Sequence, residues 1–311
     1  MAQDLTSLHE AGAAGATHAP LWHGSLQAIL QRCESGGISP VVAIMEMLVA
    51  TEDYDVVAAW LATQQHRSAA ANELAQVFRA HEAGCKKIAA MLSSDVDRPP
   101  EGATVQEGVA FCRKLFDWSV AQSEEASVAL YSLGSQEILQ AATDEIVLVL
   151  QQWGLLDGKA RALDMGCGTG RMQTALSPYL GSIVGIDVSA QMLAAARRNC
   201  NHLSNVTFSS CSGLGLEDFA DGSFELVLSV DSFPYVVQSG WALVERMFAE
   251  AARVLKPSGH FVILNFSYRD DRKRDAADAA ALAMGNSFHV VANGTMPFAL
   301  WNADAHCFRK R

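Results

Sequence analysis

The segment Ala162–Arg171, ALDMGCGTGR, gives the strongest indication of how this chain folds. Apolar residues lead into the acidic Asp164, and glycines then occupy every second position at Gly166, Gly168 and Gly170. Glycine adopts positive φ readily and has no Cβ to separate the backbone from a ligand. The segment therefore predicts a strand, a tight turn and a helix start, which together bind nucleotide-type ligands at the carboxyl edge of a parallel sheet.

The spacing of these glycines favours S-adenosylmethionine (SAM) over a dinucleotide. The dinucleotide motif is G-x-G-x-x-G, whereas Arg171 stands here where that motif has its last glycine. The carboxylate of Asp164 would repel a pyrophosphate but attract a ligand that carries an ammonium and a sulfonium. With these features the chain resembles the class I (Rossmann-like) SAM-dependent methyltransferases, whose first motif reads D-x-G-x-G-x-G.

The segments that follow extend this resemblance. Residues 182–187 predict a second strand that ends in Asp187, and Ser189 predicts the N-cap of the next helix. Residues 206–208 predict a third strand, residues 224–231 a fourth, and residues 252–263 the helix, turn and fifth strand of the family.

The resemblance implies a set of cofactor-binding residues. Asp187 takes the family's role of accepting hydrogen bonds from the ribose hydroxyls. Many members have an aspartate at the adenine edge, where this chain has serine and glycine. The full set is Tyr131, Asp164, Gly166, Cys167, Gly168, Asp187, Val188, Met192, Ser212, Gly213, Leu214 and Ser229.

The two parts of the chain differ in their predicted elements. Up to about residue 128 the pattern is helical, with Ser39 before Pro40 and a capping box at Thr104 to Glu107 as start signals. Apolar residues spaced by four and three between Leu74 and Leu92 predict one helix with one buried seam. Strands and helices alternate afterwards, which predicts a mostly parallel sheet of seven strands with helices on both faces, closed by strands at 287–291 and 305–309.

We therefore expect three regions: a flexible segment 1–20, a helical domain 21–128 and a SAM-binding domain 129–311. The helical domain is interpreted either as a cap that builds the acceptor pocket or as a homo-oligomer interface. In related enzymes an aromatic residue upstream of the first strand covers the methionine moiety of SAM, and Tyr131 is the candidate for that role.

Composition narrows the possible partners. The 311 residues carry a formal net charge of −11, and no basic face that would grip nucleic acid is evident. No apolar run is long enough to span a membrane, and no secretory signal is visible. Seven scattered cysteines without a C-x-x-C pair are typical of a reducing compartment. These features predict a cytoplasmic protein that acts on a small molecule.

No metal site is predicted. His81 and Cys85 have ligand spacing on a helix but lie on the apolar seam, so core packing is the favoured reading. His18 and His23 lie in a predicted loop without further ligands nearby.

The acceptor site is predicted where the fourth and fifth strands end. The segment Asp231–Tyr235 resembles the D-P-P-Y motif of amino methyltransferases, but an extra residue interrupts it. Asp231, Tyr235 and Tyr268 are the candidate catalytic groups. The predicted acceptor-binding residues are Asp231, Tyr235, Asn265, Arg269 and Trp301.

The expected reaction is methyl transfer from SAM to the nitrogen, sulfur or oxygen of a small metabolite, with S-adenosylhomocysteine as product. No catalytic histidine accompanies the motifs, which favours a sulfur acceptor or an amine, because these acceptors are easily deprotonated or carry no proton. Two alternatives stay open: a SAM-binding regulatory protein without activity, and an enzyme of the same fold that transfers another group.

Overall fold

Seven strands form one sheet in the order β3-β2-β1-β4-β5-β7-β6. Strands β1 to β5 are parallel, and β7 runs antiparallel to both of its neighbours. The predicted seven-stranded, mostly parallel sheet is therefore confirmed. The strands are β1 Arg161–Met165, β2 Ser182–Asp187, β3 Val206–Ser210, β4 Phe224–Val230, β5 Leu255–Leu264, β6 Phe288–Thr295 and β7 Ala305–Lys310.

The computed structural model describes residues 21–94 and 102–311. The segment 1–20 with His18, the side chain of His23 and the predicted break at residues 97–100 lie outside the described part of the chain.

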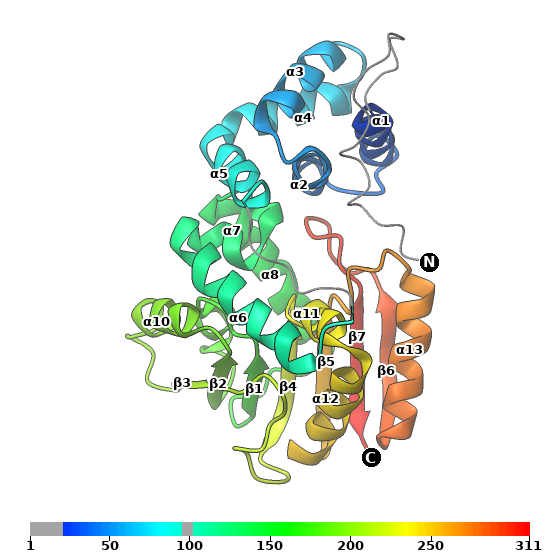
Figure 1. Ribbon diagram of the computed structural model, residues 1–311. Helices are drawn as coiled ribbons and strands as arrows, with labels where there is room; N and C mark the ends of the chain where they lie inside the picture. Colours follow the sequence, from blue (N-terminus) through cyan, green and yellow to red (C-terminus); the bar gives the residue numbers. More distant parts are fainter. Residues whose placement is uncertain (1–20, 95–101) are drawn as a thin grey trace.

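A series of helices comes before the first strand in the chain, and helices cover both faces of the sheet (Figure 1). Residue alternation along the strands explains the two faces, since Leu226 and Leu228 pack into one apolar cluster and Val227 into the other. The helices are α1 Leu21–Glu34, α2 Pro40–Thr51, α3 Tyr54–Gln64, α4 Ala69–Ala80, α5 Glu82–Leu92, α6 Val105–Gln122, α7 Glu124–Val128, the 3-10 turn η1 Leu130–Ser132, α8 Gln136–Gln152, α9 Arg171–Leu176, α10 Ala190–Asn199, α11 Phe233–Ser239, α12 Trp241–Val254 and α13 Arg272–Gly285.

The helix N-caps predicted from the sequence are present in the structure. Ser39 accepts a hydrogen bond from the Val42 amide at the start of α2, and Thr104 and Glu107 form a reciprocal capping box at the start of α6. Ser189 caps α10.

The single helix predicted between Leu74 and Leu92 is wrong. The chain leaves helical geometry at His81, which separates α4 from α5. A close approach accounts for the break, because a Cβ at Gly84 would lie 1.8 Å from the carbonyl oxygen of Leu133. The bend brings the backbone of α5 against the segment before α8. Cys85 is buried as expected, whereas His81 is only half-buried.

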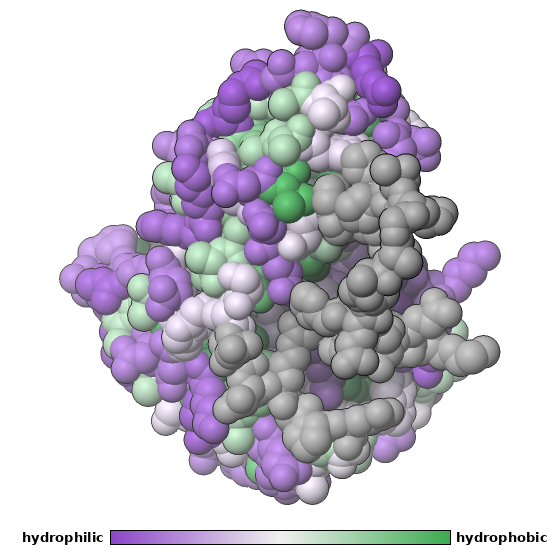
Figure 2. Space-filling view, turned by 45° about the horizontal axis from the view of Figure 1, so that its top comes forward, coloured by the Kyte–Doolittle hydropathy of each residue, from purple (hydrophilic) through white to green (hydrophobic). Residues whose placement is uncertain are grey.

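Packing continues from the helical region into the sheet. One apolar cluster joins Leu48 of α2 and Ile88 of α5 to Leu264 of β5 and Cys307 of β7. The outer surface of the upper helices is largely hydrophilic, and apolar residues show where these helices meet the rest of the molecule (Figure 2). The boundary at residue 128 stays a prediction, since this cluster extends across it.

Candidate active site

The turn after β1 brings backbone and carboxylate groups together. Gly166, Gly168 and Gly170 all have positive φ. The Gly168 amide donates to Asp187 Oδ2 at 2.9 Å, so the β1 turn is tied to the end of β2. Close packing excludes a side chain at Gly166, whose Cβ would lie 2.4 Å from the Cβ of Ser232.

Two buried carboxylates lie at this end of the site. Asp164 accepts from Gln173 Nε2 at 2.9 Å through Oδ2, while its buried Oδ1 has no partner. Burial raises the pKa of Asp164 to about 6. Asp187 accepts from the amides of Gly168 and Ser189, and burial raises its pKa too. An unpartnered buried oxygen next to a glycine turn fits a cationic ligand group, as the methionine ammonium of SAM would supply.

Arg171 is a cation of this region that is absent from the predicted set of site residues. Its Nε donates to Thr143 Oγ1 at 2.8 Å and its Nη1 to the Tyr131 hydroxyl at 3.1 Å, while the buried Nη2 has no partner. Its charge opposes the rise in pKa of both Asp164 and Asp231. Arg171 follows the last glycine directly, and that position was the signal that could have identified it.

Helix α6 covers the loop after β2. Asp117 Oδ1 accepts from Ser189 Oγ at 2.6 Å and from the Gln191 amide at 3.1 Å. Arg113 Nε donates to the carbonyl oxygen of Val188 at 3.2 Å. The side chain of Val109 reaches Gly213, whose Cβ would lie 2.7 Å from it. The helical region therefore forms part of the cofactor end, which periodicity alone did not indicate.

The acceptor end is organised around Asp231, which has a φ of 56° at the end of β4. Its Oδ1 accepts from Asn265 Nδ2 at 2.7 Å and from the Tyr268 hydroxyl at 3.0 Å. Burial raises the pKa of Asp231 to about 6, although both hydrogen bonds oppose that rise. The structure thus brings together three predicted acceptor-site residues from two strand ends.

One residue within the predicted clamp segment Asp231–Tyr235 has a packing role. Phe233 is fully buried and contacts the rings of Phe248, Phe261 and Phe266. It anchors the start of α11, which presents Tyr235 edge-on to the ring of Tyr268, with the ring centroids 5.7 Å apart.

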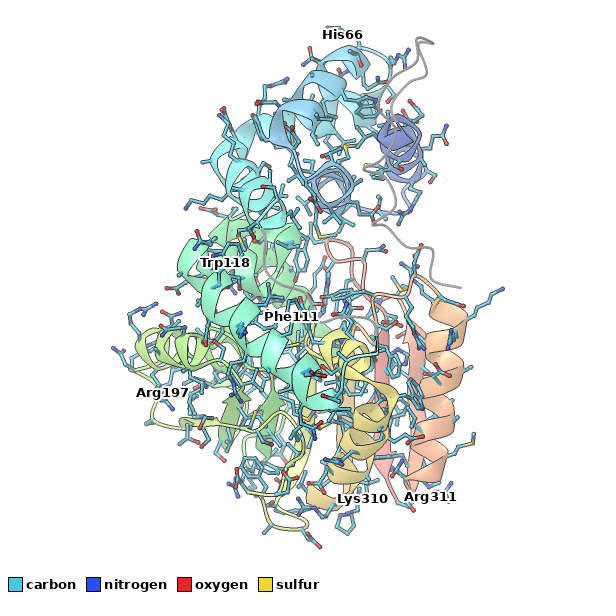
Figure 3. The ribbon with its side chains drawn as sticks, in the orientation of Figure 1. His66, Phe111, Trp118, Arg197, Lys310 and Arg311 are labelled. Carbon is cyan, nitrogen blue, oxygen red and sulfur yellow. The ribbon has the colours of Figure 1, made fainter. Side chains whose placement is uncertain are left out.

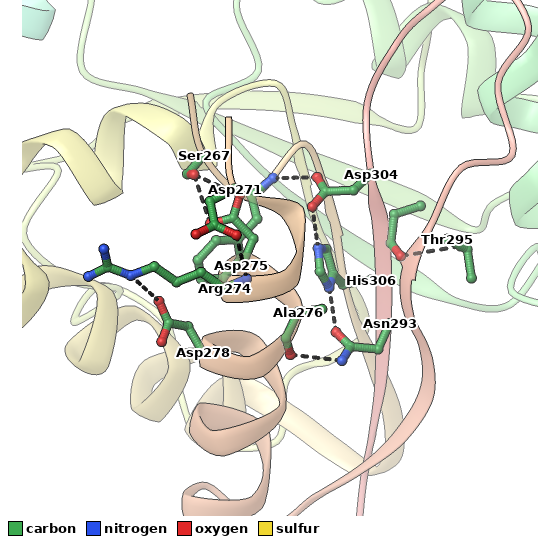
Figure 4. Close-up of polar contacts among 12 residues, drawn as sticks. Ser267, Asp271, Arg274, Asp275, Ala276, Asp278, Asn293, Thr295, Asp304 and His306 are labelled. Atoms are coloured by element: carbon green, nitrogen blue, oxygen red, sulfur yellow. Dashed lines mark hydrogen bonds and ion pairs between the residues drawn. The ribbon is translucent and has the colours of Figure 1, made fainter. Parts of the chain in front are cut away.

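A second polar network joins the loop after β5 to β6 and to the start of β7 through Asp304, His306 and Asn293 (Figure 4). Asp304 accepts from the Phe266 amide at 3.0 Å and pairs with His306 Nε2 at 3.0 Å. The other ring nitrogen of His306 lies 2.7 Å from Asn293 Oδ1. Burial alone would raise the pKa of Asp304, but the bond with His306 holds it below its usual value. This network fixes the loop that carries Asn265.

Most predicted site residues line one cavity of about 1130 Å³. Arg269 is not among its lining residues, because its guanidinium pairs with Asp275 and, at 2.8 Å, with Asp278. Ser212, Leu214 and Ser229 also lie outside the lining, and Ser229 instead meets the Ser232 hydroxyl at 2.6 Å. The predicted residues that do line it are Tyr131, Asp164, Gly166, Cys167, Gly168, Asp187, Val188, Met192, Gly213, Asp231, Tyr235, Asn265, Tyr268 and Trp301.

The cavity is acidic. Among the described residues that line it, eight are Asp or Glu and three are Arg. Such a field favours a cationic ligand and disfavours an anionic one. No cluster of three or more possible metal ligands occurs in residues 21–94 and 102–311. None of the helices in those ranges is long and apolar enough to cross a membrane.

Known proteins match the sheet region of the chain. Residues 163–263 match the family model of a methyltransferase domain. A demethylmenaquinone methyltransferase of Tropheryma whipplei is 34% identical over 106 residues, which are 34% of this chain and 41% of that protein. A 2-methyl-6-phytyl-1,4-hydroquinone methyltransferase of Synechocystis is 31% identical over 144 residues, 45% of this chain and 43% of that protein. The chain thus spans less than half the length of these two relatives.

A solved structure supports the fold over a longer stretch. The phosphoethanolamine N-methyltransferase 1 of Haemonchus contortus superposes with a TM-score of 0.51 at 11% identity, over 67% of this chain and 50% of that one. The strand order, the glycine turn tied to Asp187 and the matched domain agree with one another. Over residues 163–263 the chain is therefore similar to the class I SAM-dependent methyltransferases.

Proposed function

We propose that this protein transfers a methyl group from SAM to a small organic acceptor. The observation that carries the proposal is one continuous cavity with the glycine turn, Asp164 and Asp187 at its cofactor end and Asp231 with Tyr268 at its acceptor end. The activities named for the two relatives, on demethylmenaquinone and on a phytyl hydroquinone, support a small-molecule acceptor.

The cofactor end offers one group for each of three polar parts of SAM. Asp164 Oδ1 suits the methionine ammonium, Arg171 Nη2 the methionine carboxylate, and Asp187 the ribose hydroxyls. When bound, SAM supplies a methyl group on a sulfonium that leaves as a neutral thioether. The ring of Tyr131, stacked on Trp301 at 5.7 Å between centroids, closes the methionine side against water.

Asp231 is the proposed proton acceptor. Asn265 and Tyr268 hold its Oδ1, so Oδ2 remains for a hydrogen bond to the acceptor. With a pKa near 6 the carboxylate is largely ionised at neutral pH and still basic enough to take a proton from an amine, thiol or hydroxyl. The acidic lining favours a neutral or cationic acceptor over an anionic one. An amine or a sulfur acceptor remains the preferred assignment.

Titration calorimetry with S-adenosylhomocysteine, followed by assay of its release from SAM in a metabolite extract, tests the proposal. We expect micromolar binding that weakens at least 30-fold in Asp187→Ala, because charge-assisted hydrogen bonds to the ribose are lost. A folded wild-type protein that does not bind S-adenosylhomocysteine would overturn the proposal. Binding without any product would favour the regulatory alternative, and a product other than a methylated acceptor would favour different transfer chemistry.

A further inference from the structure

The cavity is larger than one ligand requires. Pockets for a single drug-sized ligand measure about 300–1,000 Å³, and this one measures about 1130 Å³. Part of its lining lies on helices α2, α5 and α6, away from the glycine turn.

Apolar side chains dominate this part of the lining. Helix α6 contributes residues at positions i, i+4 and i+7, which share one face of a helix. We call the set the apolar branch; it consists of Val42, Met45 and Val49 on α2, Met91 and Leu92 on α5, and Phe111, Leu115 and Trp118 on α6.

Helix α6 connects the apolar branch with the reacting end. Phe116 packs edge-on against Tyr235, with the ring centroids 4.8 Å apart, and Cys112 also lines the cavity. Phe111 and Trp118 lie on the same helix, between the upper helices and the sheet (Figure 3). A molecule with its reactive group at Asp231 can therefore extend along α6 without leaving the cavity.

The side chains of the branch retain apolar surface that a ligand could bury. Met45, Leu115 and Trp118 are only half-buried, and Val49 is 46% exposed, although a large core lies next to them. Arg32 and Glu46 beside the branch satisfy each other through hydrogen bonds of 2.7 and 3.2 Å, and the charges of Asp270 and Arg272 also act on Glu46. Apolar surface of this kind gains free energy when a hydrocarbon chain covers it.

We propose that the apolar branch binds a hydrophobic tail of the methyl acceptor, so that the substrate class is a neutral or cationic head group on an extended hydrocarbon chain. This inference rests on the proposed function, since it places the reactive head group at Asp231.

The test measures binding of phenol, 4-butylphenol and 4-octylphenol to protein saturated with S-adenosylhomocysteine, below the micelle concentration of each probe. We expect the affinity to rise about two- to fourfold per methylene, as burial of CH₂ groups predicts, and to level off once the branch is filled.

Two variants and one control locate the binding. Leu115→Glu places a charge in the branch and should reduce the affinity for 4-octylphenol at least 30-fold, with binding of S-adenosylhomocysteine unchanged within twofold. Met45→Trp should shorten the chain length at which the affinity levels off, and it covers the case in which Leu115→Glu does not fold. Lys114→Glu changes the exposed neighbouring residue and should alter neither affinity.

The failures of the two proposals are distinguishable. An absence of S-adenosylhomocysteine binding would contradict the proposed function. Normal binding of S-adenosylhomocysteine without dependence on chain length, or with the dependence intact in both branch variants, would overturn the inference about the tail and leave the proposed function standing.

Discussion

The two ends of the cavity are built in different ways. At the proposed cofactor end, the turns after β1 and β2 supply the carboxylates, and the backbone amides of Gly168 and Ser189 hold Asp187 in place. At the acceptor end, side chains meet from distant positions: Asp231 is joined by Asn265 and Tyr268, which lie 34 and 37 residues further along the chain.

This difference suggests that one end of the cavity binds the cofactor and the other end selects the acceptor. A site whose main groups lie on two neighbouring turns of the sheet suits a ligand that does not vary, because the turns fix those groups relative to one another. A site of converging side chains can change its acceptor by substitution without disturbing the sheet. Substitutions at the cofactor end should therefore change mainly the affinity for S-adenosylhomocysteine. Substitutions at the acceptor end should change mainly kcat/KM.

The largest effect is expected for Gly166→Ala. A Cβ there would clash with Ser232 and would strain a residue with φ of 74°. Binding of S-adenosylhomocysteine, measured by calorimetry, should weaken about 1,000-fold. Gly158→Ala is the matched control, because nothing lies within 4 Å of its Cβ, and its affinity should stay unchanged. Equal affinities in the two variants would contradict the role of the turn.

Asp231→Asn should lower kcat/KM about 100-fold or more, because the asparagine still accepts from Asn265 and Tyr268 but cannot take a proton. The affinity for S-adenosylhomocysteine should remain within twofold of the wild type. A matching loss of cofactor affinity would show that the two ends are not separate.

Asp164→Asn should stabilise the ligand-free protein at pH 8 by about 1–3 kcal/mol, even though it weakens cofactor binding. The folded protein binds the Asp164 proton more tightly than the unfolded chain, since its pKa rises from 3.8 to about 6. The stability that this group contributes is therefore present below pH 4 and lost as the pH rises through 6. Urea unfolding at pH 5 and pH 8 measures the change, and a less stable variant at pH 8 would contradict it.

The pH profile of the wild type should follow Asp231. Below a pH of about 6 the carboxyl group becomes protonated, so kcat at saturating SAM should fall about tenfold per pH unit. Initial rates between pH 4.5 and 8 measure this slope. The slope should disappear in Asp231→Asn, and its persistence there would assign the titration to another group.

The smallest effect is expected for Asp117→Ala, which removes the contact of α6 with Ser189 and the Gln191 amide. Binding of S-adenosylhomocysteine should weaken about three- to tenfold, because the loop after β2 loses one of its supports while Asp187 is retained. Lys114→Ala, on the same helix and exposed, serves as the control.

The sequence predicts features that depend on one segment better than features that depend on contacts between segments. The glycine turn and the carboxyl ends of β2, β4 and β5 were placed within one residue because glycine conformation and apolar patterning are local properties, whereas β6 extends to Thr295, beyond the predicted residue 291. The predicted role of Arg269 has no geometric support, since its ion pairs with Asp275 and Asp278 form through the fold of α13, which no spacing rule describes. The contacts of Arg171 with Tyr131 and Thr143 join residues far apart in the sequence, so only its place after the last glycine could have indicated its role.

The individual strands, the glycine turn and the acidic ends of β1 and β2 can be predicted from the sequence, because each depends on residues within one segment. Three features could be seen only in the folded structure. Helix α6 covers the loop after β2, and Asn265 and Tyr268 donate to the same oxygen of Asp231. The cavity also continues into the apolar branch. The physical reason is that these contacts join side chains distant in sequence, and their meeting depends on how the helices and the sheet pack together.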